Sequence, residues 1–364
     1  MDSDDDCKLC WDMIFEILTR TSLRTLDTCK CVSKKWNNLV YESSFTPLYY
    51  NRTNNVSGYI INKLTRRYDH SIYVLVTMPP DHPDDKTTGN KIDNYFPENM
   101  NILASCNQGL LCCEKHYYKT SYYVGKPTTR QWQALPNPKL RFITLGFAIM
   151  VLGSAPLRFK IIRLSYEPNH KLRWPGMYAL RCEIFDSKSW CWSWKQTGLH
   201  LRCFDYSHPA VCVGKSVYWL TDGDNVVSFH EPDESFEKFS LPQVVNKSRI
   251  NSCRLVNYKG TLGMTRLPEE RDKVMELWLR CNNNGWTLEM AVSNSCLRRS
   301  CYPPDFYDAA GRIVFIKTCK EAMFCKLEDA GSVRKVDLDQ ADRICKQYFQ
   351  YRSDWEPVDL RGRW

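Results

Sequence analysis

The hydrophobic pattern of the chain changes near Tyr49. Before this residue, apolar positions recur every three or four residues, which places them on one face of an α-helix. After it, apolar and polar residues alternate in short runs separated by Gly, Pro and Asn, as in half-buried strands joined by tight turns. The sequence therefore predicts an α+β multidomain protein, with a small helical module ahead of a long all-β domain.

Three amphipathic segments are predicted between residues 9 and 45. Thr21 and Ser22 interrupt the first apolar stripe and can cap a second helix, and Ser33 can cap a third. Pro47 fits a chain that has already left the last helix. The apolar positions of the three segments are Met13, Ile14, Ile17, Leu18, Leu23, Leu26, Cys29, Val32, Trp36, Leu39 and Val40. A unit of about 40 residues is too small to bury a sufficient core alone, so we expect it to dock onto another surface.

In the long domain, a strand–turn–strand pattern recurs with a period of about 50 residues. Its apolar anchors, spaced by 46 to 58 residues, are Trp132, Trp190, Phe236, Trp286 and Val333. Segments 211–220, 254–264 and 309–316 lie between anchors and are predicted as strands nearer the axis. Four short strands per repeat indicate a kelch-like propeller. With the strand pair at 58–78, the pattern predicts six blades, the N-terminal strand closing the last one.

Two further segments have a distinct pattern. Residues 79–97 are rich in Pro, Asp, Lys and Asn and are predicted to form a surface loop. Trp190, Trp192 and Trp194 alternate along one predicted strand, so all three side chains would point to the same face. We interpret this face as core between blades; an exposed aromatic platform for a ligand is the alternative.

Landmark residues throughout the helical module resemble the F-box. They are Leu9, Glu16-Ile17-Leu18, Arg20, Leu26, Cys31-Val32, Lys34, Trp36, Leu39 and Phe45. The family pattern has Pro where this chain has Cys10, and Leu-Pro where it has Thr21-Ser22. Without this Pro the chain lacks a preset turn at the start of the first helix, so a lower affinity for the partner is expected.

The F-box resemblance implies three helices that pack on the Skp-type adaptor of a cullin–RING ubiquitin ligase. On this resemblance, the residues expected to bind the adaptor are Leu9, Ile14, Glu16, Ile17, Leu18, Leu26, Val32, Trp36 and Leu39. An N-terminal helical cap that packs on its own C-terminal domain is the alternative interpretation of the same helices.

Segments 107–111 and 126–132 resemble the plant F-box-associated, kelch-type domain, although Gln108 is inserted in the first motif and Lys126 replaces Asn in the second. The resemblance implies a receptor whose propeller holds a protein substrate for ubiquitination and degradation, with no catalytic residue of its own. The expected domains are a disordered acidic tail at 1–8, the F-box at 9–47, the propeller at 48–354 and a tail at 355–364. This last tail either packs on the propeller and helps to close its ring of blades, or stays disordered.

A propeller enzyme or small-ligand binder with an incidental helical cap is the competing hypothesis. It would need polar residues that converge at the axial channel, which a sequence cannot place. No Gly-x-Ser-x-Gly elbow, His-Glu-x-x-His motif or Gly-rich phosphate loop occurs in the sequence. Cys7 and Cys10 form a Cys-x2-Cys pair that lacks a second pair with zinc-site spacing. We therefore expect no catalytic residue, metal or cofactor.

Composition narrows the cellular setting. The chain is 43% hydrophobic and 25% charged, as in folded globular proteins. Its net charge of +9 is modest and no run of five Lys or Arg occurs, so no nucleic-acid partner is expected. No apolar run is long enough to span a membrane. Because the acidic start MDSDDDCK lacks a signal-peptide pattern, the 18 cysteines are interpreted as reduced thiols of a cytoplasmic or nuclear protein.

Overall fold

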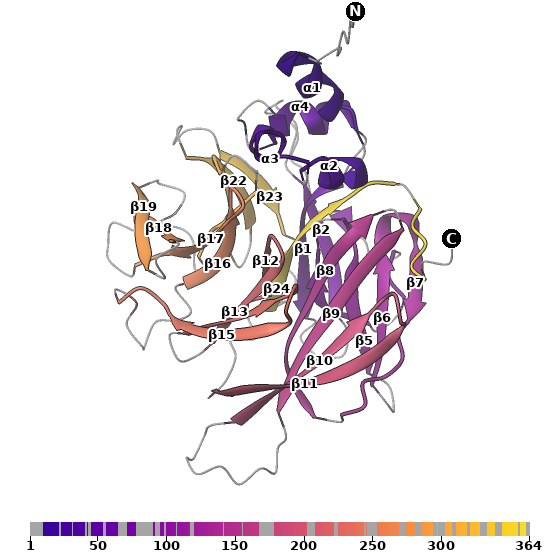
Figure 1. Cartoon of the computed structure of the whole chain (residues 1–364). Helices are drawn as coiled ribbons and strands as arrows, with labels where there is room; N and C mark the ends of the chain where they lie inside the picture. The colour runs from indigo at the N-terminus through magenta and orange to yellow at the C-terminus, as the bar shows by residue number, and fades with distance from the viewer. Residues whose placement is uncertain are drawn as a thin grey trace, which may run out of the picture.

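The computed structural model describes residues 10–361, with gaps. The residues left out within this range are 22, 31, 41, 43–44, 54–55, 65–70, 78–89, 92–94, 98–99, 107, 117–119, 141, 155, 167–177, 202–207, 222–224, 244, 246–252, 269–273, 282–284, 294–296, 298–302, 308–310, 319–320, 328–332, 339–343 and 356. The described part contains four α-helices and six four-stranded sheets (Figure 1).

The helices are α1 (Trp11–Leu18), α2 (Leu23–Lys30), α3 (Lys34–Leu39) and α4 (Phe45–Arg52). The strands are β1 (Val56–Leu64), β2 (Ser71–Thr77), β3 (Asn90–Lys91), β4 (Met100–Ser105), β5 (Leu111–His116), β6 (Thr120–Lys126), β7 (Gln131–Ala134), β8 (Ile143–Ser154), β9 (Leu157–Tyr166), β10 (Tyr178–Asp186), β11 (Cys191–Leu201), β12 (Val211–Val213), β13 (Ser216–Thr221), β14 (Asn225–His230), β15 (Ser235–Ser240), β16 (Cys253–Tyr258), β17 (Thr261–Arg266), β18 (Val274–Arg280), β19 (Trp286–Ser293), β20 (Asp305–Phe306), β21 (Ile313–Lys317), β22 (Glu321–Lys326), β23 (Val333–Asp337) and β24 (Ile344–Ser353).

The three-helix form of the module is not confirmed, because α4 follows the three expected helices. Pro47, which we took as a sign that the helix had ended, lies in the first turn of α4. There the missing N–H has no helical acceptor to lose, so proline is tolerated. The cap at Ser33 is confirmed, since its hydroxyl accepts the Trp36 N–H at 3.2 Å. Thr21 instead donates to the Leu18 carbonyl at 2.9 Å at the end of α1, and Ser22 lies outside the described residues.

The helical module buries a cluster of its own, contrary to the expectation drawn from its size. Its buried apolar side chains are Ile14, Leu18, Leu26, Leu39, Val40, Phe45 and Tyr49. Two of these, Phe45 and Tyr49, belong to α4 and stack with ring centroids 5.7 Å apart. The additional helix therefore supplies the apolar surface that three short helices lack.

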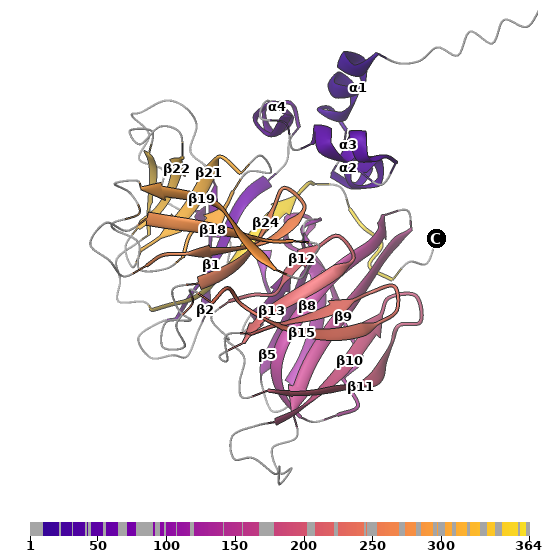
Figure 2. The same ribbon diagram turned by 60° about the vertical axis from the view of Figure 1, so that its left-hand side comes forward.

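The six sheets form a six-bladed β-propeller, as the repeat predicted. Blade 1 has the strand order β24-β1-β2-β3, and blades 2 to 6 take four consecutive strands each, from β4–β7 to β20–β23. The first strands of neighbouring blades lie next to one another around the axis (Figures 1 and 2). The expected closure by the N-terminal strand is wrong, because the C-terminal strand β24 pairs with β1 and completes the first blade.

The apolar anchors predicted from the sequence lie on or next to the outer strands of the blades, and in blade 3 the equivalent position is two residues after the predicted anchor. Arg130, Trp190 and Glu234 have positive φ and immediately precede the fourth strands of blades 2, 3 and 4. The second residues of those strands are Trp132, Trp192 and Phe236. Trp192, and not Trp190, is thus the structural equivalent of the other two anchors. Strand alternation could not reveal this shift, since it does not show which residue adopts the left-handed turn conformation.

The three alternating tryptophans do not share one environment. Trp190 lies in the turn before β11, Trp192 is buried, and Trp194 is 57% exposed. The core interpretation therefore holds for Trp192, whose indole N–H donates to the Pro136 carbonyl of the preceding blade at 2.6 Å. Trp132 and Trp286 make similar bonds, to the carbonyls of Tyr95 and Ser240 in their preceding blades. These three hydrogen bonds join the outer strand of a blade to the preceding blade.

Most of the expected strand and loop positions agree with the structure, and some cannot be compared. Segments 211–220 and 254–264 each contain the first two strands of a blade. In blade 6 the first strand is β20, ahead of the expected segment, and residues 308–310 lie outside the described part. Most of loop 79–97 also lies outside it, although β3 occurs there.

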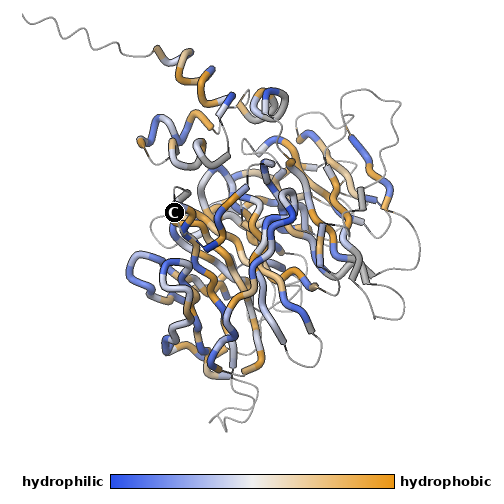
Figure 3. The backbone as a smooth tube through the Cα atoms, turned by 90° about the vertical axis from the view of Figure 1, so that its right-hand side faces the viewer, coloured by the Kyte–Doolittle hydropathy of each residue, from blue (hydrophilic) through white to orange (hydrophobic). Residues whose placement is uncertain are grey.

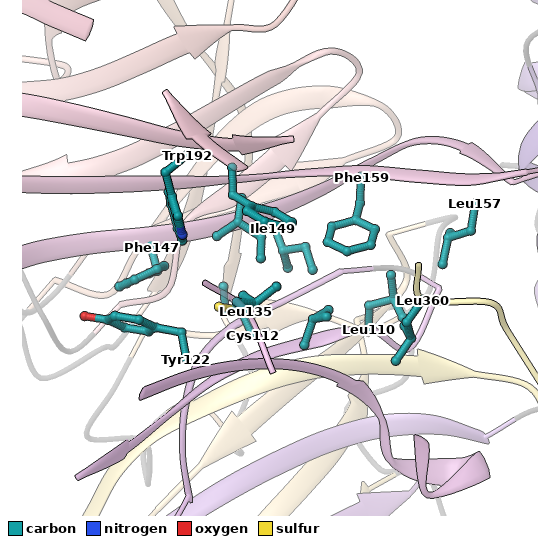
Figure 4. Close-up of a cluster of buried hydrophobic side chains, with 14 residues drawn as sticks. Leu110, Cys112, Tyr122, Leu135, Phe147, Ile149, Leu157, Phe159, Trp192 and Leu360 are labelled. Carbon is teal, nitrogen blue, oxygen red and sulfur yellow. The ribbon is translucent and has the colours of Figure 1, made fainter. Parts of the chain in front are cut away.

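The C-terminal tail packs on the propeller. Ser353 ends β24, and beyond it Leu360 is buried in the core between blades 2 and 3 (Figure 4). Gln131 donates to the Val358 carbonyl and accepts the Val358 N–H, both at 2.9 Å. Lys126 and Asp354 form a buried ion pair. The described part of the tail, which we call the C-terminal strap (residues 354–361), therefore lies over the motif at residues 126–132.

Cys112, Cys113 and Cys182 are buried thiols, and burial raises the pKa of each. Within the described residues, no group of three or more His, Cys, Asp or Glu side chains is placed to hold a metal ion; Cys7 and Cys31 lie outside them. None of the described helices is both long and apolar enough to cross a membrane.

Candidate functional site

An apolar surface on the helical module is the candidate site. Met13 and Ile17 lie one turn apart on α1 and are 51% and 48% exposed. Ile14 and Leu18 follow them by one residue each and face the core of the module. A helix repeats every 3.6 residues, so this one-residue offset separates an outward from an inward stripe. Helix α1 is thus apolar on two faces, which a helix packed on one side alone does not require.

Two further large side chains add to the exposed set. Trp11, at the start of α1, is 42% exposed, and Val32, between α2 and α3, is 63% exposed. We call Trp11, Met13, Ile17 and Val32 the apolar surface; of these, Met13 and Ile17 share one face of α1, and Trp11 lies on another side of the same helix. Figure 3 shows apolar positions along α1, the helix that lies farthest from the sheets. Several exposed apolar side chains on one small module are more typical of a protein–protein interface than of a surface that stays in water.

An ion pair fixes α1 against α4. Arg52 donates to both carboxylate oxygens of Glu16, at 2.8 and 3.0 Å, and to the Thr19 hydroxyl at 2.6 Å. Arg20, one turn after Glu16, adds a longer contact of 3.4 Å. The hydrogen bond from Arg52 lowers the pKa of the Glu16 carboxyl. Glu16 therefore has a role inside the module, whatever it contacts outside.

The start of α1 is uncapped by any side chain. Cys10 occupies the N-cap position with φ −67° and ψ 159°, and its side chain makes no capping hydrogen bond. Asp12 in the first turn places a negative charge near the positive end of the helix dipole. The φ of Cys10 equals the value to which proline is restricted, so the backbone already has the geometry that the family's proline would impose.

The structure divides the nine expected site residues into groups. Ile14, Leu18, Leu26 and Leu39 are buried inside the module, and Trp36 is half-buried against the same core. Ile17 and Val32 are exposed, Glu16 binds Arg52, and Leu9 lies outside the described residues. Trp11 and Met13 belong to the exposed set but were not among the expected residues. The spacing of Met13 to Ile17, one turn apart and offset from Ile14 and Leu18, was the signal for Met13.

The module lies against one blade of the propeller. Helix α2 is next to β8, and α4 leads into β1 after a short connection (Figure 1). The substrate-binding residues of the propeller were left open by the sequence. Among the exposed apolar residues of the described blades, Trp194 and Leu288 lie on the outer strands of blades 3 and 5, whereas Ile143 begins the first strand of blade 3.

Two family models match the chain. The F-box domain model matches residues 7–48, and the F-box associated beta propeller domain model matches residues 63–325. The F-box protein At5g41720 of Arabidopsis thaliana is 32% identical over 189 residues, which cover 48% of this chain and 96% of that protein. The F-box protein At5g49610 of the same plant is 25% identical over 328 residues, covering 86% of each chain. Both resemblances noted in the sequence are thereby confirmed.

Solved structures are more distant. A lectin of Aleuria aurantia in complex with alpha-methyl-L-fucoside has a TM-score of 0.44 at 10% identity, covering 78% of this chain and 96% of the lectin. A similarity of this size carries no conclusion about ligands of the present chain.

Proposed function

Since this chain belongs to the F-box proteins that carry an F-box-associated β-propeller, we propose that it is a substrate receptor of an SCF-type ubiquitin ligase. In this role the F-box binds a Skp-type adaptor and, through it, a cullin–RING ligase. The propeller binds a protein substrate for ubiquitination and proteasomal degradation. The receptor itself performs no catalytic step.

The exposed face of α1 is the observation that carries this proposal. Met13 and Ile17 remain about half exposed although the module has a buried core of its own. Full burial of such a side chain stabilises a complex by ~1.5–3 kcal/mol relative to leaving it exposed, so each half-exposed residue offers about half of that amount. An adaptor that covers the apolar surface gains this free energy without unfolding the module.

The propeller contributes a binding surface held close to the ligase. A substrate bound on a blade and a ubiquitin-charged enzyme bound through the adaptor belong to the same assembly. Tethering raises the effective concentration of substrate lysines near that enzyme, to the millimolar range for short flexible linkers. Proximity and orientation are therefore the whole contribution that a receptor needs to make to the reaction.

The direct test is complex formation between the purified full chain and a purified Skp-type adaptor. Size-exclusion chromatography is expected to show a stable complex with equal amounts of the two proteins. If the adaptor and the folded chain elute separately at micromolar concentration, the proposal loses its main support.

A further inference from the structure

The C-terminal strap lies outside the six sheets. Strand β24 pairs with β1 as far as the rung between Ser353 and Val56, and the strap begins at the next residue. The described residues of the strap form no strand, and Trp355 and Pro357 within it are exposed. The pairing of β24 with β1 therefore completes the ring of blades, and the contacts of the strap are additional to it.

Side chains of the motif at 126–132 bind the main chain of the strap. The amide of Gln131 donates from Nε2 to the Val358 carbonyl and accepts the Val358 N–H at Oε1, both at 2.9 Å. The Thr128 hydroxyl donates to the Asp354 carbonyl at 2.7 Å. A glutamine amide has both donors and an acceptor, so it can pair with the N–H and the C=O of one residue. The strap is therefore held through its main chain at two positions.

Thr129 orients the Gln131 amide for this contact. Its hydroxyl donates to Oε1 of Gln131 at 2.8 Å. Because this hydrogen bond needs an acceptor, it fixes Oε1 on the side of Thr129 and leaves Nε2 to face the Val358 carbonyl. A side chain that is held in place by a second hydrogen bond loses less freedom when a ligand binds. Two residues of the motif thus form one preorganised group that recognises a main chain.

Two side chains of the strap are buried. The carboxylate of Asp354 forms an ion pair with Lys126, whose side chain is 2% exposed. Six residues later, Leu360 is 7% exposed in the apolar cluster that includes Leu110 of blade 2 and Leu157 of blade 3 (Figure 4). A buried lysine favours a carboxylate because a buried charge without a partner is costly, and an apolar cluster favours an aliphatic side chain. The strap thus presents an acidic residue and a leucine at a fixed spacing.

These contacts combine the features of a peptide-binding site. Recognition of an extended peptide commonly uses main-chain hydrogen bonds for affinity and separate contacts to a few side chains for specificity. A tail that only covered apolar surface would need Leu360, but it would need neither the buried Lys126 nor the oriented amide of Gln131. The contacts therefore indicate a site that selects a sequence, and the strap is the sequence that occupies it.

We call the residues that hold the strap the strap site: Lys126, Thr128, Gln131, Leu110 and Leu157. We propose that the strap site binds extended peptide segments that carry an acidic residue and, six positions later, a leucine. The strap occupies the site in cis, and a segment of the same kind from a partner protein binds it in trans once the strap is displaced. The strap site lies on blades 2 and 3, apart from the apolar surface of the helical module, so the proposal does not depend on the ligase function.

Occupation by the strap lowers the affinity for a partner. A ligand attached by a short flexible linker has an effective concentration in the millimolar range, so a free peptide at micromolar concentration competes poorly with an intact strap. The apparent affinity for the free peptide is reduced by the fraction of molecules whose strap has left the site. A substitution that weakens the strap and leaves the strap site unchanged should therefore raise the affinity for a free peptide.

Fluorescence anisotropy with a labelled synthetic peptide of residues 354–361 tests the proposal on the full chain. Leu360→Asp in the full chain places a carboxylate in the apolar cluster, which displaces the end of the strap and changes no residue of the strap site. This variant is expected to bind the peptide at least tenfold more tightly than wild type does. Circular dichroism checks that the variant is folded, and Leu360→Ala takes its place if it is not.

Further substitutions locate the binding. Gln131→Leu, added to Leu360→Asp, removes both main-chain hydrogen bonds and should lower the peptide affinity at least tenfold. Gln133→Leu is the matched control, because Gln133 lies on the same strand β7 and donates to the Ala134 carbonyl of that strand at 3.2 Å. It should leave the peptide affinity unchanged. A labelled peptide that itself carries Leu360→Asp gives the equivalent comparison without a change in the protein, and it should not bind.

Two results would overturn the proposal. The first is a folded strap variant that binds the peptide no more tightly than wild type does. The second is equal binding of a peptide with the same composition in scrambled order, since this would show that the exposed apolar cluster attracts any chain and selects no sequence.

Discussion

Arg52 in α4 donates two hydrogen bonds to the Glu16 carboxylate in α1, at 2.8 and 3.0 Å. This pair joins the first helix of the F-box to a helix that the three-segment pattern does not include. The same α1 carries Ile17 on its exposed face. The orientation in which α1 presents that face therefore depends on its contact with α4.

Acid should weaken the α1–α4 contact. The hydrogen bond from Arg52 lowers the pKa of Glu16 in the folded module below its value in the unfolded chain. The stabilisation is therefore fully present above the unfolded-state pKa, about 4.3, and is lost as the pH falls through the lower folded-state pKa. Thermal unfolding followed by circular dichroism should show that Glu16→Gln destabilises the module at pH 7, and that the difference from wild type shrinks towards pH 3.

Glu42→Gln is the matched control for this titration, since Glu42 is exposed and lies outside the α1–α4 contact. It should leave the unfolding curve unchanged at both pH values. A gap between wild type and Glu16→Gln that stays constant with pH would assign the effect to something other than the charge of Glu16.

Asp substitutions at two neighbouring residues of α1 should both reduce adaptor binding, but for different reasons. Ile17→Asp places a carboxylate on the exposed face, where burial against an adaptor costs ~2 kcal/mol or more, so affinity should fall at least ~30-fold. Its helices and propeller should remain folded. Leu18→Asp places the charge inside the module core, so it should lose binding because the module unfolds.

Adaptor titration by calorimetry, combined with limited proteolysis of residues 10–53, separates the two effects. Full binding by Ile17→Asp would place the adaptor contact on another face of the module. Protease resistance equal to wild type in Leu18→Asp would contradict the burial of Leu18.

Replacement of Cys10 by proline should be tolerated. The φ of −67° at this position matches the proline ring, and the Cys10 side chain contributes no capping bond that would be lost. A compatible proline stabilises by ~0.4–1 kcal/mol, because it restricts the unfolded chain. Cys10→Pro is therefore expected to keep or raise adaptor affinity, measured beside Cys10→Ala as the control for loss of the thiol. If Cys10→Pro clearly lowers adaptor affinity and Cys10→Ala does not, the backbone at the start of α1 differs from that of the family pattern.

The strap should depend on the buried pair of Lys126 and Asp354. Their side chains are 2% and 12% exposed, so removal of one partner leaves a charge with little access to water. Breaking a buried pair from one side typically costs ~3–5 kcal/mol. Lys126→Met is expected to lower the free energy of urea unfolding by close to that amount. The double variant Lys126→Met/Asp354→Leu should recover much of the lost stability, because it leaves neither charge buried alone. Equal stability of the single variant and wild type would show that the strap contributes little to closure.

Gly125 should be intolerant of any side chain. A Cβ at this position would lie 2.2 Å from Cε3 of Trp132, in the facing strand β7. Gly125→Ala is therefore expected to displace the indole, break its bond to the Tyr95 carbonyl and cost ~1–3 kcal/mol as an overpacked site. Gly153→Ala is the matched control, because the nearest atom to its added Cβ is 3.7 Å away. The free energies of urea unfolding compare the two variants, and similar losses in both would contradict the steric account.

Local patterns predicted the repeat well and its exact alignment less well. Trp132 and Phe236 take equivalent places in their blades, as the spacing predicted, whereas the equivalent in blade 3 is Trp192. Pro47 was read as the end of a helix, although a first turn accepts proline without loss. In both cases the sequence allowed two local conformations, and packing selected one.

The sequence by itself determined the two domains, since helical and strand periodicity, turn residues and the motifs at 9–45 and 126–132 are local properties. Only the tertiary structure decided that Leu18 is buried while Ile17 is exposed, and that β24 completes the blade begun by β1. It alone brought Arg254 over the ring of Tyr348. These outcomes depend on contacts between residues distant along the chain, which no local pattern encodes. The first forms when α4 packs against the other helices of the module, and the others form when the six blades close into a ring.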